Sequence, residues 1–200
     1  MKTIYISTAT TETTIALFKE DHVKDEQRWP AENRESEKLL PAVSSMLEKN
    51  DLEPSQIDRL VVCTGPGGFT SVRIGVSATN AWAQSMNIPV ACVSVFDSYP
   101  NDKTIVIAAN SKEAWIKEPG KEPLFTHADD FSSTDSFYFT GIVNEQWMDL
   151  LQKNRGAYSE EKEQLPDLGK LDFENEIVEP WYYKAPNITW SKKNTPLKKS

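Results

Sequence analysis

Hydrophobic and polar positions alternate in three short segments at the start of the chain. Residues 2–7, 13–19 and 23–29 are rich in Ile, Val, Thr and aromatic side chains, which is typical of β-strands. The two connections between them are short enough to join antiparallel neighbours. This pattern predicts a three-stranded antiparallel meander.

The spacing of apolar residues then changes to three and four, which predicts two amphipathic helices. Over residues 36–50 one apolar stripe forms, and Ser36 is expected to cap the N-terminus. The stripe consists of Leu39, Leu40, Ala42, Val43, Met46 and Leu47. Over residues 71–86 the apolar arc is too wide for one contact, because Ile74, Ala78 and Ala81 adjoin the main stripe. Such a helix packs on its own sheet and on something else as well.

Further strands are predicted from β-branched and aromatic runs along the rest of the chain. They cover residues 59–64, 90–95, 104–109, 114–117, 137–140 and 181–183. A helix is expected over residues 144–153 and a loop over 156–172, and Ser94 is expected to cap a short turn of helix. The order of the elements predicts an α/β layer with a mixed sheet, and a fainter second unit is compatible with a duplicated architecture.

Composition and charge narrow the class of protein. A chain of 200 residues forms one large domain or two small ones, and 38% hydrophobic residues exclude a disordered acidic chain. The net charge of −8 argues against independent binding of nucleic acid, which needs a basic surface. The lysines at 192, 193, 198 and 199 are interpreted as a solvated terminus. No run approaches a membrane span, so we expect no membrane contact and a cytoplasmic location.

Few side chains offer candidate chemistry. Cys63 and Cys92 stand in apolar runs and are expected to be buried free thiols. Since His22 and His127 stand alone in polar segments, neither a metal site nor a nucleophilic triad is expected. The acid–base candidates have no His or Cys partner at a telling spacing, and solvated carboxylates are the expectation. These candidates are Glu12, Glu35, Glu37 and Glu113.

The glycine-rich segment at residues 65–70 lies between a predicted strand and a predicted helix. Backbone N–H groups at such a helix start can bind an anion or a nucleotide phosphate. The alternative is a tight turn with close backbone packing, which the spacing alone favours. Neither a Walker A motif nor the dinucleotide fingerprint is present.

The block GPGGFTSVRIG at residues 65–75 resembles the GPGSFTGLRIG signature of the TsaB (YeaZ) family. The segments at residues 7–10, 34–41 and 180–184 also resemble family motifs in the same order. The resemblance implies two ribonuclease H-like lobes of the actin-like, sugar kinase and heat-shock ATPase superfamily. A first lobe is expected over residues 1–100 and a reduced, divergent second lobe over 101–200. The implied signature loop comprises Gly65, Pro66, Gly67, Phe69, Thr70 and Arg73.

The family's known role implies a non-catalytic subunit that pairs with a TsaD-like catalytic subunit, and through it with a TsaE-like ATPase. The complex transfers threonylcarbamoyl to the adenosine beside the anticodon, so tRNA would be contacted only through it. No cofactor of its own is implied, whereas ATP and a metal ion are possible ligands of the partner. In the family the two helices bundle with the partner's pair. The implied partner-binding residues are Leu39, Leu40, Val43, Leu47, Ile74, Ala78 and Ala81.

The sequence departs from the family pattern at several positions. Ser7 replaces an Asp that active superfamily ATPases use for metal and phosphate, and Glu35 stands at the family's His. Gly68 and Ser71 replace the Ser and Gly of the signature, and the second-lobe IDARRGEVY pattern is eroded at residues 107–115. A scaffold tolerates such losses. The open alternatives are an ATP-dependent transferase or peptidase-like enzyme, and a homodimer that uses the same helices.

Overall fold

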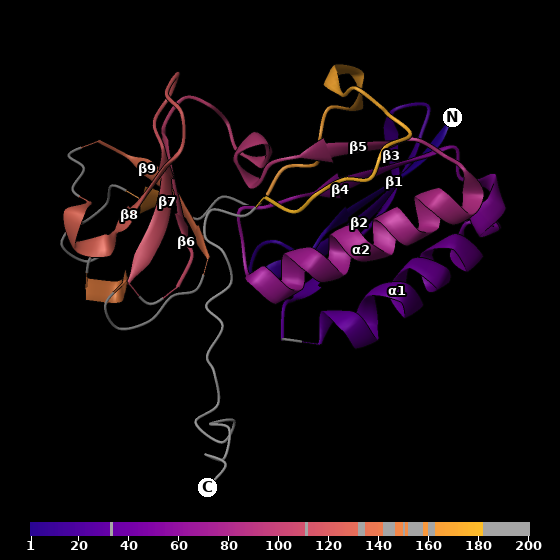
Figure 1. Ribbon diagram of the computed structural model, residues 1–200, viewed down its shortest axis with the longest axis horizontal. Coiled ribbons are helices and arrows are strands. Elements are labelled where there is room, and N and C mark those ends of the chain that lie inside the picture. Colours follow the sequence, from indigo (N-terminus) through magenta and orange to yellow (C-terminus); the bar gives the residue numbers. More distant parts are fainter. Residues whose placement is uncertain are drawn as a thin grey trace, which may run out of the picture.

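The first hundred residues form a five-stranded mixed sheet that two helices cover on one face (Figure 1). The computed structural model describes residues 1–32, 34–110, 112–131, 135–141, 147–149, 151, 158–159 and 163–181. The first-lobe elements are β1 (Lys2–Ser7), β2 (Glu12–Lys19), β3 (His22–Pro30), α1 (Glu35–Lys49), β4 (Arg59–Cys63), α2 (Phe69–Met86) and β5 (Val90–Val93). The strand order is β3-β2-β1-β4-β5, with an antiparallel meander and parallel β1, β4 and β5. The predicted meander and both helices are confirmed.

A second five-stranded sheet repeats this plan. It is built from β6 (Thr104–Ala108), β7 (Glu113–Lys117), β8 (Leu124–His127), β9 (Phe137–Gly141) and β10 (Tyr158–Ser159), in the order β10-β9-β6-β7-β8. Again the first three strands are antiparallel and the later two are parallel to the first. The duplicated ribonuclease H-like arrangement predicted above is therefore present. The sequence pattern missed β8, whose first and last residues are exposed.

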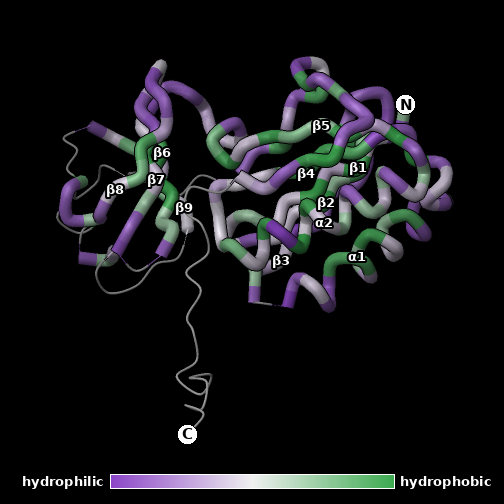
Figure 2. The backbone as a smooth tube through the Cα atoms, viewed as in Figure 1, coloured by the Kyte–Doolittle hydropathy of each residue, from purple (hydrophilic) through white to green (hydrophobic). Residues whose placement is uncertain are grey.

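Hydrophobic residues are concentrated in the central strands of both sheets (Figure 2). Side chains on successive strand residues point to opposite faces of a sheet. On β6, the side chains of both faces are buried. Ile105 and Ile107 belong to the core that they share with the first lobe, whereas Val106 and Ala108 belong to a smaller second core. That second core also contains Phe139 and Trp147, whose ring centroids are 5.6 Å apart. One face of the second sheet is therefore committed to contact between the lobes.

Residues 163–181 return to the first lobe and run along the β5 edge of its sheet and beside α2, where Figure 1 draws them in orange to yellow. Glu174 pairs with Val90 at the β5 edge, and Asn80 of α2 exchanges two hydrogen bonds with the backbone of Val178. Trp181 donates its backbone N–H to Thr64 and packs against the rings of Phe96 and Trp115. The lobes are thus not two consecutive halves of the chain, because this segment ties the end of the described chain to the first sheet.

Three local predictions are wrong. Helix α1 begins at Glu35 with Arg34 as its N-cap, so Ser36 lies inside the helix and does not cap it. Strand β5 ends at Val93 and not at residue 95, because Ser94 already caps the short 3-10 helix Val95–Ser98. The capping role expected for Ser94 is confirmed. Cys63 is a buried free thiol, but Cys92 is exposed, because it points outward from the edge strand β5.

Several predictions fall partly on residues outside the described set. Residues 147–149 are helical, and the remainder of the helix expected over 144–153 includes residues that are not described. Of the predicted aromatic strand only Trp181 is described, and it is not in a strand. The loop expected over 156–172 contains the short strand β10 and the 3-10 helix Leu168–Lys170. Among the described residues, no helix is long and apolar enough to cross a membrane.

Candidate functional site

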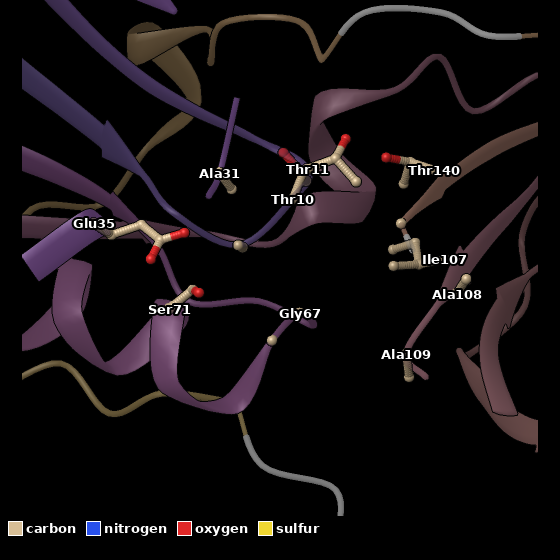
Figure 3. A pocket seen from close by; sticks show the side chains of 13 residues that line it. Thr10, Thr11, Ala31, Glu35, Gly67, Ser71, Ile107, Ala108, Ala109 and Thr140 are labelled. Carbon is tan, nitrogen blue, oxygen red and sulfur yellow. The ribbon is translucent and has the colours of Figure 1, made fainter. Parts of the chain in front are cut away.

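A cavity of about 150 Å³ lies between the two lobes. Three first-lobe segments line it: the turn after β1, the start of α1 and the glycine-rich loop before α2 (Figure 3). The ends of β6 and β9 form the opposite wall. The lining residues are Ala9, Thr10, Thr11, Ala31, Glu35, Gly67, Gly68, Ser71, Ile107, Ala108, Ala109, Thr140 and Gly141. The cavity lies where the two β1-equivalent strands end, so the duplicated fold itself creates it.

The glycine-rich loop packs directly on the turn after β1. A Cβ atom on Gly67 would stand 2.0 Å from the carbonyl oxygen of Ala9, so only glycine fits. Gly68 has ordinary space around it and is the N-cap of α2. The tight turn with close backbone packing is therefore realised, and the loop also places the start of α2 on the cavity.

The other signature residues lie around this turn. The Gly65–Pro66 peptide bond is cis, and the Gly65 carbonyl accepts a hydrogen bond from Val95 N–H. Phe69 and Thr70 begin α2, and the guanidinium of Arg73 lies 5.0 Å from the centre of the Phe69 ring. The signature residues thus hold the loop and the helix start in place, and of this set only Gly67 lines the cavity.

Glu35 differs from the solvated carboxylate that was expected. It is the first residue of α1, only 3% exposed, and its side chain points into the cavity (Figure 3). Its Oε1 atom has no hydrogen-bond partner among the described residues. Glu37 is exposed, as expected, and Glu12 and Glu113 are half-buried. The sequence gives no local signal for the burial of Glu35, because the cavity that it lines is built from segments far apart in the chain.

A second buried carboxylate was missed entirely. Glu163 is 6% exposed and accepts hydrogen bonds from the hydroxyls of Tyr5, Ser7 and Thr10 at 2.9–3.1 Å. A guanidinium N–H of Arg28 donates to its backbone carbonyl at 2.7 Å. Glu163 therefore places a carboxylate beside the end of β1, at Ser7. It lies outside the cavity lining and binds the return segment to the sheet.

This cluster shifts the titration of its neighbours. Burial, with the Glu163 carboxylate second, raises the pKa of Tyr5 well above its usual value. Burial likewise raises the pKa of Tyr99 to about 12, and the same two causes raise the pKa of the Cys63 thiol. None of these groups is therefore an acid or base near neutral pH. Within the described part of the chain, no three His, Cys, Asp or Glu side chains are grouped to hold a metal ion, and both histidines are exposed.

The helix residues expected at a partner surface divide into two groups. Leu39, Val43 and Leu47 are at most 5% exposed and belong to the chain's own core, so their assignment to a partner surface is wrong. They form the stripe with which α1 covers the sheet. In contrast, Leu40 is 60% exposed. On α2, Ala81 is exposed, and Ile74 and Ala78 are half-buried at the edge of the core.

Comparison with known proteins defines the class first. YeaZ from Pseudomonas aeruginosa has a TM-score of 0.60 at 18% identity and covers 70% of this chain and 75% of that chain. A crystal structure of a protein "with similarity to peptidase YEAZ from Pseudomonas aeruginosa" has a TM-score of 0.71 at 15% identity, covering 92% and 99%. With the two repeated sheets, these likenesses define the fold of the actin-like, sugar kinase and heat-shock ATPase superfamily.

Sequence comparison finds relatives that carry the name TsaB. The tRNA threonylcarbamoyladenosine biosynthesis protein TsaB of Bacillus subtilis is 38% identical over 84 residues, which are 42% of this chain and 37% of that protein. TsaB of Escherichia coli is 30% identical over 95 residues, 47% and 40% of the two chains. The family model described as TsaD, tRNA N6-adenosine threonylcarbamoyltransferase, matches residues 30–106. The chain is similar to these TsaB proteins over part of its sequence, and its match spans about two fifths of the length of these relatives.

Proposed function

We propose that this protein is a non-catalytic subunit in the formation of threonylcarbamoyladenosine in tRNA and pairs with a TsaD-type catalytic subunit. The names of the TsaB relatives support the pathway. The TsaD family model matches residues 30–106, a range that contains both α1 and α2. Two related chains that carry the same helix pair can associate through equivalent surfaces, as subunits of symmetric dimers do.

The observation that carries the pairing is the outward side of the helix layer. Leu40 of α1 and Ala81 of α2 are exposed, and Ile74 and Ala78 lie half-buried beside the latter. Helices pack at 8–10 Å between axes when the side chains at the contact are small. Alanines at these positions allow a partner helix to come close, and Leu40 supplies apolar area for burial, as in helix bundles.

The non-catalytic part of the proposal is supported by the first-lobe strand end. Ser7 offers no carboxylate for a metal–nucleotide complex, and the nearby Glu163 carboxylate accepts hydrogen bonds from four hydroxyl groups, those of Tyr5, Ser7, Thr10 and Ser98. In the second lobe, the side-chain amide of Asn110 donates a hydrogen bond to the Glu113 carboxylate. We therefore propose that the chain has no cofactor of its own and that ATP and a metal ion belong to the partner.

The wider assembly follows from the same reasoning. A TsaE-like ATPase would join through the catalytic subunit. Because the net charge of −8 disfavours direct contact with phosphates, tRNA would be contacted only through the complex. In the absence of the partner, the same helix surface would support a homodimer. The site of action would be the cytoplasm, where the complex meets its tRNA substrate.

The test is co-purification with the tagged TsaD-type subunit of the same organism. Ala81→Arg places a charged side chain on the proposed surface and should reduce capture at least tenfold. Leu124→Arg is the matched control: Leu124 is 63% exposed on β8 in the other lobe, and capture should be unchanged. Circular dichroism should show both variants folded.

Normal pairing of the Ala81→Arg variant would overturn the surface. Light scattering of the isolated chain extends the test, since a homodimer that dissociates in the same variant supports one shared surface. Calorimetry with ATP and Mg²⁺ addresses the non-catalytic part. If the isolated chain binds ATP with micromolar affinity and hydrolyses it, the proposal of a non-catalytic subunit is overturned and the chain is an enzyme.

A further inference from the structure

The cavity between the lobes contains an unusual acceptor. Only 3% of the surface of Glu35 is exposed, and its Oε1 atom lacks a hydrogen-bond partner among the described residues. A buried polar atom without a partner is destabilising by about 1–3 kcal/mol, and more when it is charged. Figure 3 shows the Glu35 carboxyl group directed into the cavity beside Ser71. Because Glu35 lines the cavity, a ligand with an N–H or O–H donor placed there would face its carboxyl group.

The start of α2 supplies the opposite character in the same cavity. This helix has 18 residues, and its N-cap is Gly68. Among the described residues, no side chain donates or accepts a capping hydrogen bond at this end, and the first turn of the helix contains no Asp or Glu. A helix N-terminus favours a negative group through its backbone N–H groups and its dipole. Gly67 and Gly68 keep the approach open, because neither carries a side chain. An anionic end of a ligand would be stabilised here.

The Glu35 carboxylate and the N-terminus of α2 together favour a ligand that carries one positive and one negative group. A simple anion would be repelled by the Glu35 carboxylate, and a simple cation would lie against two helix N-termini, those of α1 and α2. A molecule with an ammonium group at Glu35 and a carboxylate at the α2 start avoids both penalties. The second-lobe wall adds an apolar patch at Ile107, Ala108 and Ala109 and one hydroxyl, that of Thr140.

The size of the cavity limits the ligand further. Sites for drug-sized molecules measure roughly 300–1,000 Å³, whereas this cavity measures about 150 Å³. A whole nucleotide would extend beyond this volume, whereas a molecule of a few heavy atoms fits inside it. We propose that the interlobe cavity binds a free α-amino acid with a short side chain, with the ammonium group on Glu35 and the carboxylate at the start of α2. This site is independent of the helix surface proposed for pairing.

The test uses the full chain and L-alanine, L-serine and L-threonine as probes, with binding followed by calorimetry and by NMR shifts of Gly67, Gly68 and Ser71. At least one probe should bind. Glu35→Gln keeps the shape but removes the charge that faces the ammonium group, and should weaken binding at least tenfold. Glu37→Gln is the matched control, because Glu37 is an exposed carboxylate in the same helical turn, and should bind like the wild type.

Two analogues separate the halves of the proposed contact. Propionate lacks the ammonium group and ethylamine lacks the carboxylate, so each should bind at least tenfold more weakly than L-alanine. Equal binding of propionate and L-alanine would overturn the role of Glu35, and equal binding of ethylamine would overturn the role of α2. Absence of binding by all three amino acids, or unchanged binding in folded Glu35→Gln, would overturn the site. Pairing through Ala81 would be unaffected by any of these results.

Discussion

The hydroxyl of Ser7 donates a hydrogen bond of 2.9 Å to a carboxylate oxygen of Glu163, a residue 156 positions later in the chain. The same oxygen accepts a hydrogen bond from the Tyr5 hydroxyl, and the other carboxylate oxygen accepts one from Thr10. The family resemblance implies an Asp in the superfamily's ATPases where Ser7 lies. In this chain a carboxylate reaches the same strand end from the return segment and fastens that segment there.

Restoring the superfamily residue should therefore damage the protein. Ser7→Asp would place a second carboxylate about 3 Å from Glu163 in a buried site, where two like charges cannot both be ionised at low cost. We expect a loss of about 2 kcal/mol or more in the free energy of unfolding, measured in urea at neutral pH. Adding Glu163→Gln to Ser7→Asp should recover much of the loss. A Ser7→Asp variant as stable as the wild type would contradict the close contact.

Adjacent leucines on α1 should behave in opposite ways. Leu39 is 1% exposed in the core and Leu40 is 60% exposed. Leu39→Ala removes buried methyl groups and leaves a cavity, which should lower the free energy of unfolding by about 2–5 kcal/mol. Leu40→Ala should change it by less than about 0.5 kcal/mol. Urea unfolding measures both changes. A larger loss of stability in Leu40→Ala than in Leu39→Ala would show that Leu40, and not Leu39, faces the sheet.

Only Leu40 should affect pairing. Leu40→Arg should reduce capture of the TsaD-type subunit while the thermal midpoint stays within a few degrees of the wild type. The sequence pattern alone put Leu39, Leu40, Val43 and Leu47 on one arc and could not separate them. The packing of α1 on the sheet distinguishes them, because it buries the other three and leaves Leu40 at the margin.

The elements with strong local periodicity were predictable, and the long-range polar contacts were not. Strands β1 and β2 and helix α2 lie within two residues of their predicted bounds, because alternation and helical spacing are properties of neighbouring residues. The cavity that Glu35 lines is built from segments far apart in sequence, and so is the Ser7–Glu163 contact. No local pattern carries either, so only the glycine-rich part of the candidate site could be predicted from the sequence.

Two neighbouring glycines of the signature loop should tolerate substitution very differently. Gly67→Ser would drive a Cβ atom into the Ala9 backbone at 2.0 Å, which should be destabilising by about 1–3 kcal/mol. At Gly68 the nearest atom to a new Cβ is the Ser71 hydroxyl oxygen at 3.6 Å. Gly68→Ser also places a good N-cap residue on α2, so its stability should equal or slightly exceed the wild type. Thermal unfolding distinguishes the two, and equal losses would contradict the close approach of the two turns.

The ion pair that joins β3 to the end of α1 should make stability depend on pH. Lys49 and Asn50 donate hydrogen bonds of 2.9–3.0 Å to the Asp25 carboxylate, and the Lys49 contact is the main reason that its pKa is lowered. Since the pKa is lower in the folded chain, this stabilisation is complete above the unfolded-state pKa of about 4. It is lost as pH falls through the folded-state pKa.

Asp25→Asn should therefore lower the free energy of unfolding at pH 7 by a few tenths to about 1 kcal/mol, the range of partly exposed ion pairs. The difference from the wild type should narrow as the pH falls below about 4, because protonation of Asp25 then removes the same interaction. Lys49→Gln should show the same narrowing, and the double variant should lose less than the two single losses added together. Strictly additive losses, or a difference independent of pH down to 3, would show that Asp25 and Lys49 do not stabilise the fold as a pair.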